Sequence, residues 1–385
     1  MPYPMIVLLA GVWGQAIPDV VVDKQQEVFQ RLWAEDFEWR FAELPTNGRV
    51  AEHRTPYSGY IYPDTARGTA SILRKYDKAL NGGGSPATIH EQRDTSQTGP
   101  TSRSQAGRGL FGRMFARRSR GVPYWYGHCN GWTAAAMRHA EPQRSVTRNG
   151  VEFTPADIKG LLAEIYIYNE HIVLGGDQYR MNPGTFHAII ANWLGRGEHP
   201  MAMEADPGSE KWNYPIHKFA TTSTQRGRNQ VEVRMTIVYA KYSDREHQRS
   251  PRIEGKKHFH YALNLDDTGA IVGGHWYRGS SRIDMLWMPL QPKASGKPGN
   301  ERGNPHVNVD EVLAIWRDSV PKDVRTAWLI ADPAPLDRVH EVGQVANMSP
   351  VQEPAKIAEA GDDMVVAAAY EEQAGAAASD PDRSE

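Results

Sequence analysis

The chain of 385 residues contains one cysteine, Cys129, so no internal disulfide can hold the fold together. Stability must therefore come from packing. The composition allows for this, because 40% of the residues are hydrophobic and the chain has 11 tryptophans and 16 tyrosines. We expect a globular protein with one large domain or two smaller ones.

The sequence around Cys129 predicts reactivity. Cys129 precedes a run of small helix formers at 133–137, and glycines flank it at Gly127 and Gly131. A thiol in the first turn of a helix lies at the positive end of the helix dipole, which favours the nucleophilic thiolate. The glycines would let a substrate approach the backbone closely. The alternative is that Cys129 is a small, buried, apolar side chain that serves only packing.

The charge and the N-terminus bear on partners and location. The formal net charge is −2, which does not indicate a nucleic-acid partner. Residues 1–20 hold a short apolar stretch with small residues near Ala16, like the end of a secretory signal, but without a basic start. A signal predicts an extracellular or cell-envelope location, and the alternative, a buried N-terminal strand, predicts a cytoplasmic one. No other stretch approaches the ~18 apolar residues of a spanning helix, so we expect no stable membrane span.

Apolar spacing and composition divide the chain into segments. Residues 24–81 are predicted to form a helical N-terminal part of the main domain, with helices over 25–37 and 71–80. A stretch rich in Gly, Ser, Thr and Gln, ending in a basic run, predicts a flexible basic insertion over 82–121. Residues 336–385 are expected to form a disordered, acidic, Ala-rich tail.

Residues 122–335 carry the densest signals and are predicted to form the catalytic domain. Thr154, Pro155 and Asp157 are typical of a capped helix start. The predicted strands cover residues 185–194, 201–206, 231–239, 258–265 and 270–272. An antiparallel sheet with helices ahead of it in the sequence indicates an α+β fold.

A nucleophilic cysteine needs a base and a group that orients the base. Cys129 is followed by His187 on a predicted strand and by Asp206 at the end of the next one. A carboxylate beside a histidine can fix the imidazole tautomer and stabilise its positive form. Cys129, His187 and Asp206 are therefore the candidate catalytic residues. Because the chain has 14 histidines and 46 acidic residues, their order alone does not establish that they meet.

Three segments resemble the transglutaminases of the plant-defence-elicitor type. The segment YWYGHCNGWTAAA at 124–136 resembles that family's active-site cysteine, and NPGTFHAIIANWLG at 182–195 resembles its histidine strand. WNYPIHKF at 212–219 is similar to the Trp-Asn-Gln-Pro-Val segment that triggers plant immunity. Here Tyr214 replaces the glutamine and Ile216 the valine, which puts elicitor activity in question.

The resemblance covers residues 50–290 and implies a papain-like core that catalyses acyl transfer. It implies that Cys129 attacks the side-chain amide of a protein glutamine, His187 protonates the departing ammonia and Asp206 holds His187. A lysine amine would then form an isopeptide bond, whereas water would give deamidation. The implied partners are proteins that carry Gln and Lys side chains.

Tryptophans are the candidate substrate-binding residues: Trp125, Trp132, Trp212 and Trp276, with Trp287 as a further member of the same aromatic trough. The resemblance also implies that an indole N–H stabilises the oxyanion, and Trp33, Trp39 and Trp125 remain open for this role. Core packing is the alternative for each of these side chains.

No metal site or cofactor is predicted. His258 and His260 share one face of a predicted strand, but no third ligand lies at a suitable spacing, so a structural pair is favoured. Asp266 and Asp267 lie in a loop that lacks the EF-hand ladder, and calcium dependence stays open. His128 is expected to be exposed or hydrogen-bonded rather than to tune the thiol.

Two other functions remain open. A cysteine peptidase or amidase would use the same three catalytic residues, with water as the second nucleophile. A non-catalytic binding or elicitor protein would carry these residues only as a vestige. Amine incorporation and a Cys129→Ala variant separate the three alternatives.

Overall fold

The computed structural model describes residues 15–97, 122–176, 181–208 and 210–330. The predicted tail at 336–385, most of the N-terminal stretch at 1–20 and the basic end of the predicted insertion lie outside these residues.

A nine-stranded sheet dominates the described residues. Its order is β1-β10-β9-β8-β7-β6-β11-β5, with β2 paired to β7, and every neighbouring pair is antiparallel. The strands are β1 Gln15–Ala16, β2 Asn47–Arg49, β5 His171–Gly175, β6 Met201–Glu204, β7 Asn213–Gly227, β8 Gln230–Ala240, β9 Glu254–Leu265, β10 Ile271–Trp276 and β11 Met285–Pro289. A separate hairpin pairs β3 Val146–Arg148 with β4 Val151–Phe153.

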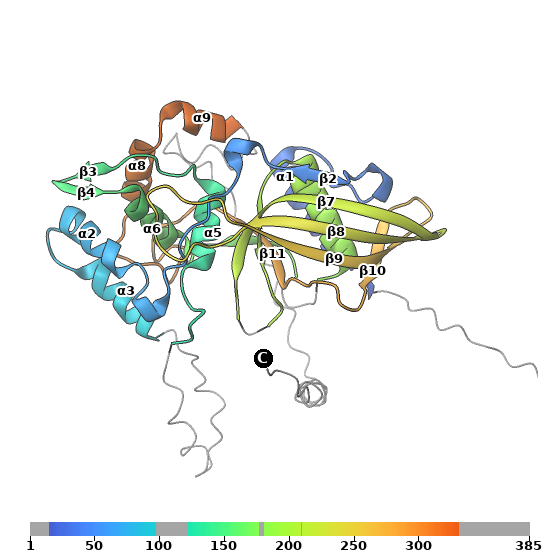
Figure 1. Ribbon diagram of the computed structural model, residues 1–385, viewed down its shortest axis with the longest axis horizontal. Coiled ribbons are helices and arrows are strands. Elements are labelled where there is room, and N and C mark those ends of the chain that lie inside the picture. Colours follow the sequence, from blue (N-terminus) through green and yellow to red (C-terminus); the bar gives the residue numbers. More distant parts are fainter. Residues whose placement is uncertain (1–14, 98–121, 177–180, 209, 331–385) are drawn as a thin grey trace, which may run out of the picture. The chain divides into compact units, whose positions relative to one another are not determined.

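Most helices precede the consecutive strands β6 to β11 in the sequence, and two helices follow them. The helices are α1 Asp19–Trp33, α2 Ala70–Leu80, α3 Pro86–Gln97, α5 Cys129–Arg138, α6 Pro155–Tyr166, α7 Pro183–Ile190, α8 Val309–Ser319 and α9 Lys322–Ile330. Short 3-10 turns are η1 Phe41–Glu43, η2 Glu52–Arg54 and η3 Asp64–Ala66, and a π-helical segment, η4 Ala191–Arg196, follows α7. Figure 1 shows α2, α3, α5, α6 and α8 grouped together and β7, β8 and β9 as long neighbouring strands. Helices combined with an antiparallel sheet confirm the predicted α+β class.

Side-chain alternation explains the long strands. Along β8, Val231, Val233, Met235 and Ile237 are buried, while the residues between them reach outward. A strand with period two buries one face and leaves the other wet. The strand predicted at 231–239 is therefore confirmed.

Helix α6 starts as its sequence predicts. Thr154 accepts a hydrogen bond from the Asp157 backbone, and the Asp157 side chain accepts one from the Thr154 backbone. This capping box, with Pro155 at the first helical position, fixes the helix start. The predicted helix is confirmed.

The glycines beside Cys129 serve internal packing, which corrects the expectation that they admit a substrate. A Cβ atom on Gly131 would lie 2.2 Å from the carbonyl oxygen of Ala163, so this glycine lets α5 and α6 pack closely. A Cβ atom on Gly127 would lie 2.7 Å from the carbonyl oxygen of Ile61. Both glycines position the start of α5 by close backbone contact.

Residues 185–194 are helical, so the strand predicted there is wrong. The Asn182 side chain accepts a hydrogen bond from the Gly184 backbone, and Pro183 occupies the first helical position, which together start α7. The whole run is buried. A short apolar run buried on all sides does not reveal its period, which is why the sequence misled.

The first part of the predicted insertion also differs from expectation. Residues 86–97 form α3, which packs against α2. The Asp77 carboxylate of α2 accepts hydrogen bonds from the Ala87 and Thr88 backbones at 3.0 and 2.9 Å. These bonds satisfy donors of the first turn of α3, which a helix end would otherwise leave unpaired.

Candidate active site

Cys129 is the first residue of α5, and its neighbour is tightly held. The His128 backbone N–H donates to the Ile61 carbonyl oxygen at 2.6 Å, which anchors the residue before the helix. Cys129 is 6% exposed. Its sulfur lies 3.6 Å from the Lys211 carbonyl oxygen and 3.7 Å from Nδ2 of Asn213, so it can donate to one and accept from the other.

Two opposing effects set the ionisation of the thiol. Burial raises the pKa of Cys129 above its ordinary value of 9.0. Hydrogen bonds from the backbone and side chain of Asn213, and from the Asn130 backbone, act in the other direction because they stabilise the thiolate. Burial prevails, so the resting thiol holds its proton at neutral pH and attack requires a proton acceptor.

An open pocket of about 280 Å³ leads to the sulfur. We call it the thiol pocket. Charged and aromatic side chains line it, namely Asp64, Glu204, Lys211, Arg302, Trp125 and Tyr168. An elongated polar substrate segment can reach Cys129 here without unfolding any element.

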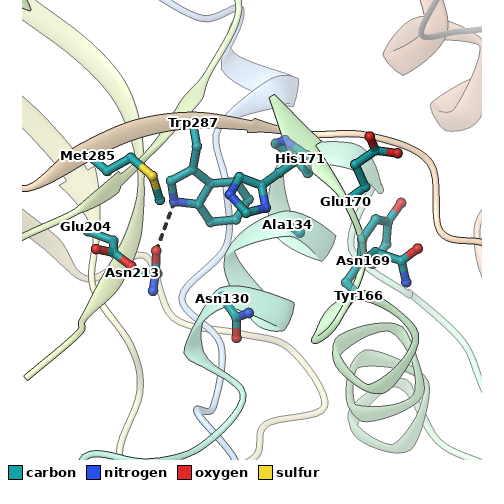
Figure 2. Close-up of a pocket in the computed structure, with 11 residues that line it drawn as sticks. Asn130, Ala134, Tyr166, Asn169, Glu170, His171, Glu204, Asn213, Met285 and Trp287 are labelled. Atoms are coloured by element: carbon teal, nitrogen blue, oxygen red, sulfur yellow. Dashed lines mark hydrogen bonds between the residues drawn. The ribbon is translucent and has the colours of Figure 1, made fainter. Parts of the chain in front are cut away.

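A second, narrower pocket of about 90 Å³ adjoins the first (Figure 2). We call it the side pocket. It shares Asn130, Glu204 and Asn213 with the thiol pocket, and its other polar and aromatic lining residues are Tyr166, Asn169, Glu170, His171 and Trp287. The shared residues place both pockets around the start of α5.

The Asn213 amide has a defined orientation. Figure 2 shows the Trp287 indole directed at Asn213, and Nε1 of Trp287 donates to Oδ1 of Asn213 at 2.9 Å. Since Oδ1 accepts this bond, the NH₂ group must be the end that faces the sulfur of Cys129. Asn213 is thus a fixed donor beside the nucleophile.

Glu204, Lys211 and Asp284 form an ionic network that borders the thiol. Nζ of Lys211 lies 3.3 Å from Glu204 and also binds Asp284. Burial raises the pKa of the Glu204 carboxyl, and the opposing charge of Lys211 does not cancel this effect. The negative charge of Glu204 in turn raises the pKa of Cys129. Glu204 is therefore electrostatically coupled to the thiol and suited to proton transfer.

The structure gives the side chains of His187 and Asp206 partners other than Cys129. His187 lies on α7, its Nδ1 bonds to the Tyr261 hydroxyl at 2.7 Å, and burial alone lowers its pKa to about 3. The Asp206 side chain is 62% exposed and bonds to Lys257 at 2.8 Å. These contacts do not include a Cys129–His187–Asp206 triad, which stays a prediction.

The predicted substrate tryptophans have different environments. Trp125 lines the thiol pocket. Trp212 is half-buried beside Lys211 and stacks on Tyr242. Trp132 is 2% exposed and donates to the Tyr57 carbonyl oxygen, so it packs in the core.

The remaining tryptophans also either pack in the interior or line the thiol pocket. Trp276 donates to the Met181 carbonyl oxygen and packs on Phe186, which is a structural role. Trp33 and Trp39 pack on Phe29 and Phe37, which leaves Trp125 as the one of the three oxyanion candidates that lines the thiol pocket.

The His128 side chain lies in a buried acidic cluster. Its Nε2 lies 3.4 Å from Glu91 and 3.2 Å from Glu164. Burial lowers the pKa of His128, but the two carboxylates outweigh it and raise the value to about 9. Burial and the charge of Glu164 raise the pKa of Glu91 to about 8. Of the two expectations for His128, the structure shows the hydrogen-bonded one, because the side chain is buried and not exposed.

The two strand histidines each have their own partner. His258 bonds to the Thr236 hydroxyl and His260 to the Glu232 carboxylate. The Asp266 carboxylate accepts hydrogen bonds from Thr268 and Ala270 within its own turn.

Sequence reasoning missed the roles of Asn213, Glu204 and Lys211. A signal was present for two of them: Asn213 lies in the Trp-Asn-x-Pro segment, and Glu204 lies within the strand predicted at 201–206. Their proximity to Cys129 arises because β6 and β7 pair beside α5.

Comparison with known proteins gives two findings. Residues 90–182 match the family described as Transglutaminase elicitor, a span that includes Cys129 and neither His187 nor Asp206. The crystal structure of the GP42 transglutaminase from Phytophthora sojae is similar in fold, with a TM-score of 0.60 and 21% sequence identity, over 79% of this chain and 99% of that chain. No curated protein sequence matches the chain. The family match and the shared fold support the resemblance to an elicitor-type transglutaminase.

Membrane association can be judged only for part of the chain. Among the described residues, no helix is both long and apolar enough to cross a bilayer.

Proposed function

We propose that the protein is a cysteine-dependent acyltransferase that acts on the side-chain amide of protein-bound glutamine. The observation that carries the proposal is the placement of the Cys129 sulfur: it opens α5, borders the thiol pocket and receives N–H groups from Asn213 and Asn130. A nucleophile with preset donors beside it is what acyl transfer requires.

The reaction proceeds in two steps. The Cys129 thiolate attacks the amide carbon, the C–N bond breaks, and ammonia leaves with the proton that the thiol gave up. The thioester then reacts with a lysine amine to form an isopeptide bond, and the thiolate is released. Water in place of the amine gives glutamate, which is deamidation. The partners are thus proteins with accessible Gln and Lys side chains.

Asn213 and Glu204 take the roles that the sequence had assigned to other residues. Nδ2 of Asn213 donates to the oxyanion of the tetrahedral intermediate, because Trp287 holds the amide in that orientation. Glu204 accepts the thiol proton and returns it to the leaving ammonia, and its raised pKa suits both directions. Lys211 holds Glu204 in place between the two transfers.

The side pocket favours transfer to an amine over hydrolysis. The pocket is small, with a volume of about 90 Å³, and Glu170, Glu204 and the Trp287 ring line it. Carboxylates and an aromatic face attract an ammonium group. The side pocket therefore provides a route by which a lysine side chain reaches the thioester beside Asn213.

The test measures ammonia release from a glutamine peptide and incorporation of a fluorescent primary amine in parallel. We expect ammonia release to persist without amine and the label to appear with it; Cys129→Ala should abolish both. Ammonia release without any label at saturating amine would leave a hydrolase. No release from an authentic, folded chain would refute the catalytic proposal.

Two matched variants distinguish the proposed base from the sequence-predicted one. Glu204→Gln is expected to lower kcat about 10²–10³-fold, in the range of a lost acid/base. His187→Gln is expected to retain kcat within about threefold once folding is verified, since His187 bonds to Tyr261. The reverse pattern would restore the predicted Cys-His-Asp triad.

The segment at 212–219 that resembles the immunity-triggering sequence is largely buried, which favours the catalytic function over a non-catalytic elicitor function. Residues 213–217 are buried in β7 and pair with β6 and β8. A receptor that reads these side chains would need the strand to be released. An immune response to the folded Cys129→Ala variant would favour the elicitor alternative.

The location belongs to the proposal as well. We propose an extracellular or cell-envelope location, in keeping with the short apolar stretch in residues 1–20. Mass spectrometry of the N-terminus from separated culture fractions tests it, and an intact N-terminus found only in the cytoplasm would contradict it.

A further inference from the structure

Directly behind the nucleophile lies a buried cluster that the proposed reaction does not use. It consists of Glu91 on α3, His128 at the N-terminal cap of α5 and Glu164 on α6. All three side chains are at most 5% exposed, and one ligand atom from each lies within 4.8 Å of the other two. The cluster therefore joins three separate elements at the start of α5.

The cluster places two buried carboxylates beside one imidazole. Among the described residues, His128 is the one cationic group bonded to Glu91 or Glu164. A third carboxylate, that of Asp64, lies close enough to interact with both Glu91 and His128. Buried carboxylates are costly unless a cation neutralises them. One imidazole and two carboxylates that converge on one point form a donor set that suits a divalent cation.

The distances fit a shared ion better than direct hydrogen bonds. Nε2 of His128 lies 3.4 Å from Glu91 Oε1 and 3.2 Å from Glu164 Oε2. A charge-assisted hydrogen bond is usually shorter, about 2.7–2.9 Å. By contrast, ligand atoms bound tetrahedrally at about 2.0–2.1 Å from a zinc ion lie roughly 3.3 Å apart. The two distances in the cluster lie on either side of that value.

Surrounding groups hold the two carboxylates in place. The Thr69 backbone donates to Glu91 Oε1 at 3.0 Å, the Thr69 hydroxyl donates to Glu164 Oε2 at 2.5 Å, and Asn304 donates to Glu164 Oε1 at 3.2 Å. A Cβ atom on Gly68 would lie 1.9 Å from Glu91 Oε1, so the backbone closes over the cluster there. Ligands held by outer hydrogen bonds in a closed setting are typical of structural metal sites.

We propose that Glu91, His128 and Glu164 bind one divalent transition-metal ion of the zinc class, through Nε2 and one oxygen of each carboxylate. One imidazole with two carboxylates suits zinc, and manganese is the closest alternative. The ion ties α3 and α6 to the residue before Cys129. We assign it a structural role, because its three ligands are buried and Cys129 is not one of them.

The test uses the full chain carrying Cys129→Ala, so that no thiol can contribute to metal binding. Metal content is measured by inductively coupled plasma mass spectrometry after expression in zinc-supplemented medium. We expect about one zinc per chain, a lower Tm after dialysis against dipicolinate, and recovery on adding zinc. Calcium should not restore the Tm, because it prefers oxygen ligands.

Variants locate the ion. Glu164→Gln and, separately, Glu91→Gln should reduce bound zinc at least tenfold. His260→Gln is the matched control, since it removes a His–Glu pair from the sheet face, and it should retain the zinc. Cobalt in place of zinc should give visible absorption bands that Glu91→Gln loses.

Several outcomes would overturn the proposal. One such outcome is a correctly folded chain that holds less than a tenth of an equivalent of metal and whose Tm does not change with zinc, manganese or cobalt. It would show that Glu91, His128 and Glu164 share hydrogen bonds and bind no metal ion. Zinc lost equally in His260→Gln would show adventitious binding. Neither outcome bears on acyl transfer, which the ammonia assay measures separately.

Discussion

Replacing Asn213 is the sharpest test of the site. Its Nδ2 lies 3.7 Å from the Cys129 sulfur and its Oδ1 accepts from Trp287 at 2.9 Å. Asn213→Ala removes one preset donor from the oxyanion, which costs about 10²–10³-fold in kcat. It also leaves the buried Trp287 N–H without its acceptor, which costs about 1–3 kcal/mol of stability.

A second substitution separates these two effects. Asn213→Asp keeps an acceptor for Trp287 but loses the donor and adds a negative charge beside the sulfur. Its Tm should therefore stay closer to that of the wild type than the Tm of Asn213→Ala, while its kcat should fall at least as far. The added charge should also raise the pKa of Cys129 further.

The assay is steady-state ammonia release, with thermal unfolding monitored on the same preparations. Asn229→Ala, an asparagine at the β7–β8 turn that bonds to Asp267, serves as the control and should change neither kcat nor Tm appreciably. If Asn213→Ala keeps kcat within about threefold of the wild type, the oxyanion role of Asn213 must be abandoned.

Further predictions concern the thiol, the helix contact and pH. Because burial raises the pKa of Cys129 above 9.0, alkylation by iodoacetamide should accelerate about tenfold per pH unit from pH 7 to beyond pH 9; a plateau below pH 8 would contradict this. The folded chain holds this proton to higher pH than the unfolded chain, so the contribution of Cys129 to stability should decline above about pH 9, measured by urea unfolding. Gly131→Ala should cost about 1–3 kcal/mol or more, measured in the same way, because its Cβ atom would overlap the Ala163 carbonyl. Gly208→Ala, where no neighbour lies within 4 Å, should be nearly neutral, and equal losses for both would refute the packing argument.

The sequence predicted the elements whose signals are local. The capping box at Thr154 and the alternation along 231–239 each depend on neighbours in the chain, and both are confirmed. The helix start at Cys129 is of the same kind, since small helix formers follow it at 133–137. Local propensity and pattern are sufficient where they agree with tertiary packing.

The strand predicted around His187 failed because burial hides the period. Every residue from Pro183 to Ile190 is buried, so neither a period of two nor one of 3.6 shows in the sequence. The Asn182 cap and Pro183 were the only local signs of a helix. His187 therefore lies on a helix and not on a strand, and its Nδ1 bonds to the Tyr261 hydroxyl.

The partners of Cys129 could not be predicted, since they come from long-range pairing. Glu204 and Asn213 face each other across the register of β6 and β7, and Trp287 reaches Asn213 from β11. Sequence separation from Cys129 is more than 70 residues for each of them. Only the order of strands in the sheet decides that these side chains meet.

The arrangement around α5 has a consequence for how reactivity is controlled. The Asn213 amide faces the Cys129 sulfur. The residue before Cys129, His128, contacts the buried carboxylates of Glu91 and Glu164. Because burial keeps the thiol protonated, a substrate that excludes water from the thiol pocket does not by itself create the thiolate. Ionisation must come from a nearby acceptor and from N–H donors that are already in place. Rigidity of the first turn of α5 is therefore a requirement of the chemistry, and the contacts of Gly127, Gly131 and His128 supply it.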